Sequence, residues 1–209
     1  MIERITRRRV IPVVVLQHAD DAIPLAEALL EGGLDVMEIT FRTAAAAESI
    51  RRITDAFPEM LVGAGTILSP DQALEAHDAG ATFALAPGLN PDVVIAAQNA
   101  GLAFSPGVMT PSEIERALGL GCNLLKFFPA AAAGGIPMIK ALSGPYAHTG
   151  VRFIPTGGIS ATNMRVYLAV PVVAAIGGSW MVDPKLIAAK DWTTITTLTR
   201  EAVELAKSS

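Results

Sequence analysis

Short apolar runs alternate with amphipathic, alanine-rich segments from one end of the chain to the other. A short apolar run bounded by turn residues is typical of a buried strand, and apolar positions three and four apart indicate a helix. The pattern predicts strands at residues 10–16, 34–40, 61–65, 82–86, 103–105, 123–127, 152–156 and 172–177. It predicts helices at residues 23–31, 44–56, 71–79, 91–100, 111–118, 136–142, 163–168, 184–189 and 191–207.

Helix start and stop signals support these boundaries. Ser69-Pro70-Asp71, Asn90-Pro91-Asp92 and Thr110-Pro111-Ser112-Glu113 each combine a capping side chain, a proline in the first turn and an early acid. Glycines mark several ends, as at Gly80 and Gly101. The boundaries therefore divide the chain into regular strand and helix units.

Eight strands, each followed by a helical pattern, predict an α/β protein with one (β/α)8 TIM barrel over residues 1–209 and a short N-terminal helix. An open doubly wound sheet is the alternative, but the first strand lacks the G-x-G-x-x-G turn and no linker divides the chain. In a barrel, catalytic groups lie at the carboxyl ends of the strands.

Lys126 is the one charge in the apolar run Leu124-Leu125-Lys126-Phe127-Phe128-Pro129. A buried ammonium without compensation costs several kcal/mol. Loss of the proton is cheaper and yields a neutral amine, which attacks ketones to form Schiff bases. The alternative is a lysine whose stem packs inside while its head reaches water.

Glu38 and Arg42 fall on one face of the second strand because side chains alternate along a strand. The apolar residues Met37, Ile39 and Phe41 occupy the other face, so Glu38 and Arg42 are expected to point into the barrel mouth. There a glutamate can shuttle protons and an arginine can grip a carboxylate. A structural Glu38–Arg42 ion pair is the alternative. By the same alternation Lys126 can also point inward, beside Glu38.

Small or rigid residues end most of the other strands, where they bring backbone close to a ligand. Two of these turns contain Gly-Gly and follow the seventh and eighth strands: Thr156-Gly157-Gly158-Ile159-Ser160 and Ile176-Gly177-Gly178-Ser179-Trp180. Barrel enzymes often bind phosphate at this place through backbone N–H groups. The alternative reading is a pair of ordinary turns.

Composition excludes several classes. The formal net charge is −4, with 16 basic and 20 acidic residues, so there is no electrostatic footprint for nucleic acid. No apolar run reaches the roughly 18 residues of a membrane span. A single cysteine, Cys122, rules out an internal disulfide, and the scattered His18, His77 and His148 lack metal-ligand spacing. We expect a cytoplasmic protein without a metal site.

Six motifs together resemble the KDPG aldolase family, the class I 2-dehydro-3-deoxy-phosphogluconate and 4-hydroxy-2-oxoglutarate aldolases. They occur in order along nearly the whole chain: Glu38-Ile39-Thr40-Phe41-Arg42-Thr43, Val62-Gly63-Ala64-Gly65-Thr66, Ala86-Pro87-Gly88-Leu89, Lys126-Phe127-Phe128-Pro129-Ala130, Pro155-Thr156-Gly157-Gly158-Ile159-Ser160 and Ile176-Gly177-Gly178-Ser179-Trp180. The chain departs from the family pattern at Ala131, where many relatives are acidic, and at Ser105, where an isoleucine is expected. Those departures bear on which sugar acid is preferred.

The resemblance implies a role for each matching residue. Lys126 matches the Schiff-base lysine and Glu38 the general acid/base. The implied substrate contacts are Arg42 and Thr66 for the pyruvyl carboxylate, Pro87 and Phe128 as pocket walls, Thr156 near the reacting carbons, and Gly157, Gly158, Gly178 and Ser179 for the phosphate. The resemblance also implies a homotrimer of single barrels, no cofactor, and a place in the Entner–Doudoroff pathway.

The sequence therefore predicts cleavage of 2-dehydro-3-deoxy-6-phospho-D-gluconate to pyruvate and D-glyceraldehyde 3-phosphate. Alternatives within the class are the 6-phosphogalactonate epimer, a 6-sulfogluconate analogue and 4-hydroxy-2-oxoglutarate. Outside the class, a phosphosugar epimerase or isomerase would use Glu38 as a base and Lys126 as an electrostatic group, with no covalent intermediate. A barrel that only binds phosphorylated metabolites is the third alternative.

Overall fold

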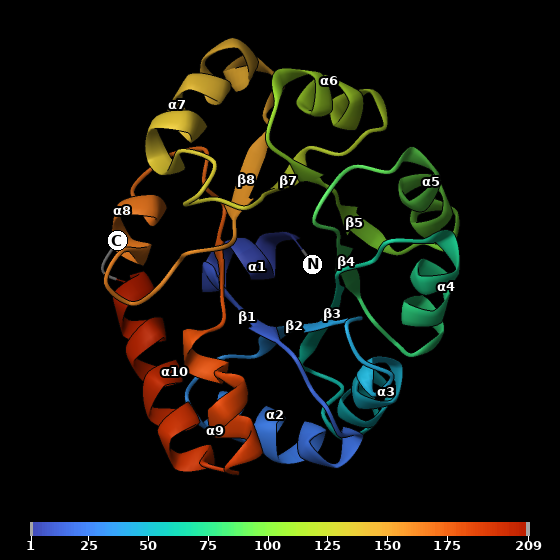
Figure 1. Cartoon of the computed structure of the whole chain (residues 1–209), viewed down its shortest axis with the longest axis vertical. Helices are drawn as coiled ribbons and strands as arrows, with labels where there is room; N and C mark the ends of the chain where they lie inside the picture. Colours follow the sequence, from blue (N-terminus) through green and yellow to red (C-terminus); the bar gives the residue numbers. More distant parts are fainter. Residues whose placement is uncertain (1, 208–209) are drawn as a thin grey trace.

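Parallel strands and helices alternate in the computed structural model, which describes residues 2–207 (Figure 1). The strands are β1 (Val10–Val14), β2 (Val36–Thr40), β3 (Leu61–Gly65), β4 (Phe83–Leu85), β5 (Ala103–Ser105), β6 (Gly107–Val108), β7 (Leu124–Phe127), β8 (Arg152–Pro155) and β9 (Ile176–Gly178). The α-helices are α1 (Ile2–Arg8), α2 (Ala22–Glu31), α3 (Ala46–Ala56), α4 (Pro70–Asp78), α5 (Pro91–Asn99), α6 (Pro111–Gly119), α7 (Gly135–Tyr146), α8 (Met164–Leu168), α9 (Pro184–Ala188) and α10 (Trp192–Lys207). Three short 3₁₀ turns are η1 (Ala19–Asp21), η2 (Ala147–Thr149) and η3 (Trp180–Val182).

The strands form two parallel sheets in the middle of the molecule, with helices α2 to α10 around the outside and α1 in the centre of the view (Figure 1). One sheet has the order β5-β4-β3-β2-β1-β9 and the other the order β6-β7-β8. Pro106 alone separates β5 from β6, and isolated parallel bridges join Phe153 to Val173 and Thr156 to Gly177. The predicted α/β class with parallel strands is confirmed.

Most predicted elements are found within one or two residues of their expected bounds, two differ more, and one short strand is additional. The strand predicted at 172–177 is only β9, because residues 172–175 follow an irregular path after Pro171 and touch the sheet only through the Val173 bridge. The two-residue β6 was not predicted. Helix α7 runs past Gly144 and Pro145 because Tyr146 is held by α6, its hydroxyl donating to the Glu115 carboxylate at 2.9 Å.

The helix starts follow the capping signals in the sequence. Ser69 accepts a hydrogen bond from the Gln72 N–H at 3.2 Å, and Asn90 accepts one from the Asp92 N–H at 3.0 Å. Thr110 and Glu113 form a reciprocal capping box at the start of α6. These caps fix where each helix leaves the loop that follows a strand.

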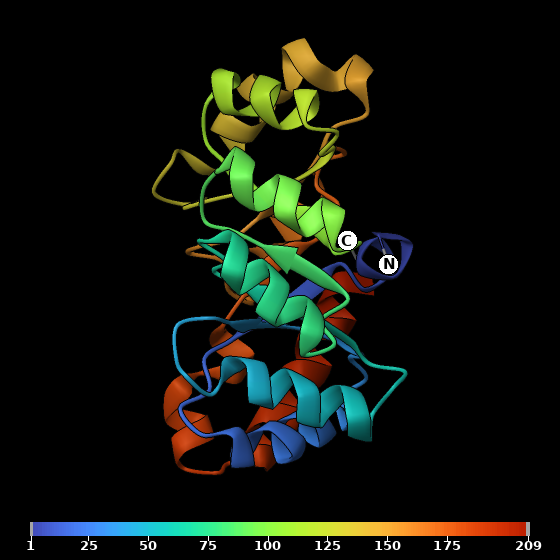
Figure 2. The same cartoon turned by 90° about the vertical axis from the view of Figure 1, so that its right-hand side faces the viewer.

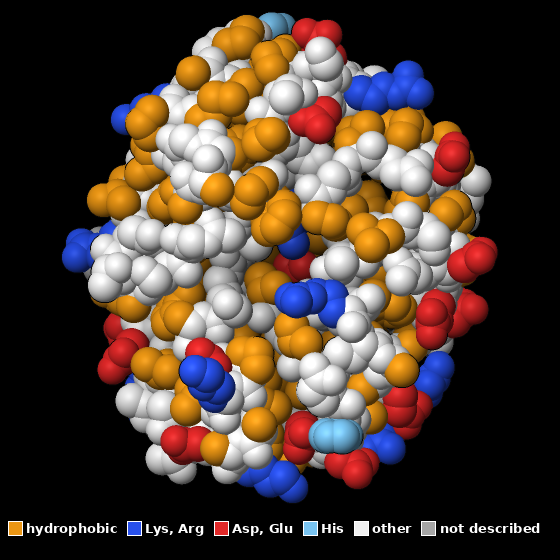
Figure 3. Space-filling model, viewed as in Figure 1, with side chains coloured by type: hydrophobic (Ala, Val, Ile, Leu, Met, Phe, Trp, Pro, Cys, Tyr) orange, Lys and Arg blue, Asp and Glu red, His pale blue; other side chains and the backbone are white. Residues whose placement is uncertain are grey.

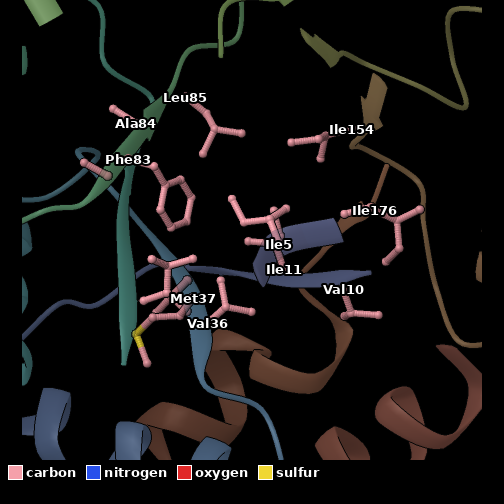
Figure 4. Close-up of a cluster of buried hydrophobic side chains, with 14 of the residues drawn as sticks. Ile5, Val10, Ile11, Val36, Met37, Phe83, Ala84, Leu85, Ile154 and Ile176 are labelled. Carbon is pink, nitrogen blue, oxygen red and sulfur yellow. The ribbon is translucent and has the colours of Figure 1, made fainter. Parts of the chain in front are cut away.

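The predicted N-terminal helix is present as α1, on the side where the strands begin. Arg8 and Arg4 donate hydrogen bonds to Asp35, which directly precedes β2, at 2.6 and 3.0 Å. Ile5 is 1% exposed and points into the interior with Ile11 and Val36 (Figure 4). Figure 2 shows α1 at one edge of the molecule. Helix α1 therefore covers the amino end of the strands and leaves their carboxyl end for a site.

No helix in residues 2–207 has both the length and the hydrophobicity needed to cross a bilayer.

Candidate active site

Lys126 and Glu38 form a buried ion pair between β7 and β2. Their Nζ and Oε1 atoms lie 2.9 Å apart, and the two side chains are 5% and 1% exposed. The predicted inward convergence of the two residues is therefore observed, and the alternative of a lysine head in water is wrong. Glu38 pairs with Lys126 rather than Arg42, so the structural Glu38–Arg42 pair is also wrong.

Gly65 makes room for the carboxylate of Glu38. In the parallel register Thr40 lies opposite Gly65, two residues beyond the Glu38–Gly63 pair. A Cβ atom at position 65 would overlap Glu38 Oε1 and Cδ, so only glycine allows this position of the carboxylate. Oε2, the second oxygen, is fully buried and has no hydrogen-bond partner among the described residues.

Arg42 and Thr66 follow the paired ends of β2 and β3, so the register brings them to the same part of the rim. Arg42 is exposed, and it makes no hydrogen bond or ion pair with the described part of the chain. Thr66 adopts a left-handed backbone conformation with φ of 58°. A β-branched residue in that conformation is strained, and such strain is concentrated at functional sites.

Phe128 directly follows the lysine strand β7, and Pro87 lies next to β6, the strand that pairs with it. Lys126 Nζ is 5.8 Å from the centre of the Phe128 ring, within range of a cation–π contact. Pro87 packs against Gly107, whose N–H donates to Gly88 O at 3.0 Å, and Gly107 pairs with Lys126 in the sheet. The two residues can therefore form walls next to the amine.

A cavity of about 170 Å³ gathers the glycine-rich turns after β8 and β9. Its lining residues are Val13, Phe128, Thr156, Gly157, Gly158, Ile159, Gly177, Gly178 and Ser179. All four residues predicted to hold phosphate are among them. None of the lining side chains carries a charge, so an anion there would be bound through backbone N–H groups and hydroxyls.

Sequence reasoning missed Val13 as a member of this cavity, and it named Ile159 and Gly177 within the two turns without giving them a role. Val13 pairs with Glu38 in the register, so its inward direction follows from the alternation along β1. Gly177 is required by Thr156, because a Cβ at position 177 would overlap the threonine hydroxyl. That packing has no signal in the sequence.

The space-filling view shows acidic and basic atoms together in a hollow near the middle of the face seen in Figure 1 (Figure 3). Within residues 2–207 no three His, Cys, Asp or Glu side chains lie close enough together to hold a metal ion. The candidate site therefore combines the paired amine and carboxylate of Lys126 and Glu38, the guanidinium of Arg42 at the strand ends, and the uncharged cavity of the glycine-rich turns.

Comparison with known proteins identifies the family. A family model described as KDPG and KHG aldolase matches residues 1–198. The chain belongs to the KDPG and KHG aldolase family. Relatives named 2-dehydro-3-deoxy-phosphogluconate aldolase include one from Haemophilus influenzae, 46% identical over 99% of this chain and 97% of its own. Another, from Treponema pallidum, is 48% identical over 97% of this chain and 96% of its own.

A solved structure of the same family has a similar fold and a covalent ligand. The KDPG aldolase from Legionella pneumophila, with pyruvate captured as a covalent carbinolamine intermediate, is 44% identical and superposes with a TM-score of 0.92. The match covers 96% of this chain and 97% of that one. The family resemblance therefore extends over nearly the whole length of the chain.

Proposed function

We propose that this chain is a class I aldolase that cleaves 2-dehydro-3-deoxy-6-phospho-D-gluconate to pyruvate and D-glyceraldehyde 3-phosphate. The buried Lys126–Glu38 pair carries the proposal, because it places an amine and a proton acceptor 2.9 Å apart at the carboxyl end of the strands. The names of the relatives and the carbinolamine in the Legionella enzyme support it.

Imine formation starts with a proton transfer from Lys126 to Glu38, which frees the amine to attack the C2 ketone. Glu38 then returns that proton to the carbinolamine hydroxyl, and water leaves. The product is a protonated imine on Lys126, and Glu38 is again a carboxylate that can act as a base. The 2.9 Å separation of Lys126 Nζ and Glu38 Oε1 allows the first of these transfers without movement of either strand.

The protonated imine accepts the electron pair when the C3–C4 bond breaks. Glu38 takes the C4 hydroxyl proton, glyceraldehyde 3-phosphate leaves, and an enamine remains on Lys126. Glu38 gives the proton to C3 of the enamine, and water hydrolyses the resulting imine to free pyruvate. Oε2 of Glu38, which has no partner among the described residues, is the oxygen available to the substrate hydroxyl.

The remaining side chains bind and orient the substrate. Arg42, free at the rim, and Thr66 hold the pyruvyl carboxylate, because a guanidinium presents two parallel donors to a carboxylate. Phe128 and Pro87 enclose the reacting carbons, with Thr156 beside them. The cavity formed by Gly157, Gly158, Gly178 and Ser179 holds the phosphate.

The two sheets are proposed to be arcs of one closed (β/α)8 barrel, which forms a single domain over residues 1–209. Lys126 lies in one sheet and Glu38 in the other, so their contact requires the two inner faces to meet. The bridges between β8 and the β9 segment lie at one junction, and the single residue between β5 and β6 lies at the other. Assembly as a homotrimer, which the family resemblance implies, can be measured by light scattering of the purified protein.

Borohydride reduction with pyruvate tests the proposal. Wild-type protein should gain the mass of a reduced pyruvate adduct, and peptide mapping should place it on Lys126. Lys126→Ala should form no adduct, and Lys140→Ala, which removes an exposed lysine from α7, should trap pyruvate normally. An adduct in Lys126→Ala would exclude this nucleophile. No adduct in the wild type would favour an epimerase or a binding protein.

A comparison of kcat/KM identifies the substrate within the class. The 6-phosphogluconate derivative should be cleaved faster than its 6-phosphogalactonate epimer, the 6-sulfogluconate analogue and 4-hydroxy-2-oxoglutarate. A preference for 4-hydroxy-2-oxoglutarate would show that the cradle is not used for phosphate.

A further inference from the structure

Glu38 has one satisfied and one unsatisfied carboxylate oxygen. Oε1 accepts from Lys126, and Oε2 is fully buried without a partner in the described residues. A buried carboxylate oxygen without a donor costs free energy, so native sites normally supply a side chain or an ordered water. Before substrate binds, a donor from a side chain or a water is therefore expected near Oε2.

Ser105 brings an unused hydroxyl to the same interior layer. Ser105 is the last residue of β5 and is 7% exposed. Its hydroxyl makes no hydrogen bond to the described residues. Ser105 pairs with Leu85 in the sheet. The register that pairs Gly63 with Phe83 places Leu85 next to Gly65, two residues further along both strands. Gly65 lies against the Glu38 carboxylate. Along the sheet, Leu85 is therefore the side chain between that carboxylate and Ser105.

The other side of the layer also points to Ser105. Leu85 and Ile154 point toward each other across the interior (Figure 4). Ile154 pairs with Lys126. The Lys126 N–H donates at 2.9 Å to the carbonyl oxygen of Pro106, which directly follows Ser105. The serine therefore stands between Leu85 and the lysine strand, facing the same interior as Lys126 and Glu38.

A cleft in the wall gives water access to the serine. Strands β5 and β7 belong to different sheets and do not pair at residues 103–105 and 122–124. A cavity of about 210 Å³ lies between them, lined by Ser105, Ala103, Leu124, Cys122 and Gln98 among others. One water occupies about 30 Å³ of liquid, so the cleft has ample room for solvent.

We infer that Ser105 is a positioning residue: it holds a water, admitted through the β5–β7 cleft, that donates a hydrogen bond to Glu38 Oε2. The water also connects Glu38 to solvent, so the carboxylate exchanges its proton without using the mouth that the substrate fills. The inference rests on the proposed aldolase mechanism, since its effect appears in the proton transfers of Glu38.

Deuterium exchange into pyruvate isolates this step. On the imine, Glu38 takes a proton from C3, the C–H electron pair forms the enamine double bond, and a deuteron from solvent replaces that proton through Glu38. Ser105→Ala should slow exchange of the methyl group about tenfold, the effect of one hydrogen bond to a charged group. Its borohydride-trapped fraction at saturating pyruvate should stay at the wild-type level.

Three controls make the result specific. Ser105→Thr keeps the hydroxyl and should restore exchange. Ser49→Ala removes a hydroxyl of α3 that donates to Ala45 O, and it should change nothing. Adding Ser105→Ala to Glu38→Gln should slow exchange no further, because the base is already lost. Wild-type exchange in Ser105→Ala, failure of the threonine to rescue, or equal losses of exchange and trapping would each overturn the inference. Wild-type protein that neither traps nor exchanges would instead refute the aldolase function.

Discussion

Gly65 lies so close to the Glu38 carboxylate that a single methyl group at position 65 would overlap Oε1 and Cδ. Gly65→Ala should therefore push the carboxylate away from Lys126 while leaving both reactive residues in the chain. We expect kcat to fall by roughly 10²-fold, within the range for loss of general acid/base catalysis. Steady-state kinetics measure this, and wild-type kcat in the variant would show that Glu38 works from another position.

The contact between Glu38 and Lys126 was predictable in part. The apolar residues on the other face of β2 turn Glu38 inward, and alternation along β7 allows Lys126 to point the same way. The need for glycine at position 65 beside Glu38, and at position 177 beside Thr156, was not predictable. Each depends on side-chain packing between neighbouring strands. The break at Pro106 and the end of α7 at Tyr146 also escaped prediction. At Pro106, the pairing of β6 with β7 decides where the strand breaks. At the end of α7, the contact of Tyr146 with Glu115 outweighs local propensity.

Breaking the buried pair should destabilise the protein, and removing both charges should restore much of the loss. Lys126→Met leaves the Glu38 carboxylate buried without its partner, which costs about 3–5 kcal/mol. The double variant Lys126→Met with Glu38→Gln removes that charge and should be more stable than the single variant. Urea unfolding measures both, and additive losses would show that the two groups are not coupled.

Thr66 should combine a gain in stability with a loss of function when it is replaced by glycine. Thr66→Gly relieves the left-handed conformation, at φ of 58°, and should raise the free energy of unfolding by about 1 kcal/mol. It also removes a proposed carboxylate contact, so KM for pyruvate in methyl exchange should rise. Lys190→Gly, at φ of 54° outside the proposed site, should gain stability with KM unchanged. Equal KM values in both variants would separate Thr66 from substrate binding.

Asp35 should make the attachment of α1 sensitive to acid. Burial raises the pKa of the carboxyl, but the hydrogen bonds from Arg8 and Arg4 outweigh it and hold the pKa below its ordinary value of 3.8. The ion pairs therefore stabilise the fold fully above about pH 4, and this contribution is lost as pH falls through the lowered pKa of the folded state.

Asp35→Asn should lower the free energy of unfolding at pH 7 by at most about 1 kcal/mol, since the arginines are partly exposed. It should also flatten the decline in stability below pH 4. Urea unfolding at pH 7 and pH 3 checks this, with the exposed Asp55→Asn as control. The same acid dependence in wild type and Asp35→Asn would contradict it.

Gly158 offers a way to weaken the phosphate cradle without touching the amine. Its φ is 76°, and an added Cβ would press against Ala131 Cβ at 2.5 Å, so Gly158→Ala should displace the turn that lines the cavity. We expect kcat/KM for the phosphorylated substrate to fall at least tenfold, while borohydride trapping of pyruvate, which has no phosphate, is retained. Gly101→Ala has the same φ of 76° but no atom within 4 Å, and should reproduce the backbone strain alone. If Gly158→Ala impaired trapping and cleavage equally, the turn would serve the lysine rather than the phosphate.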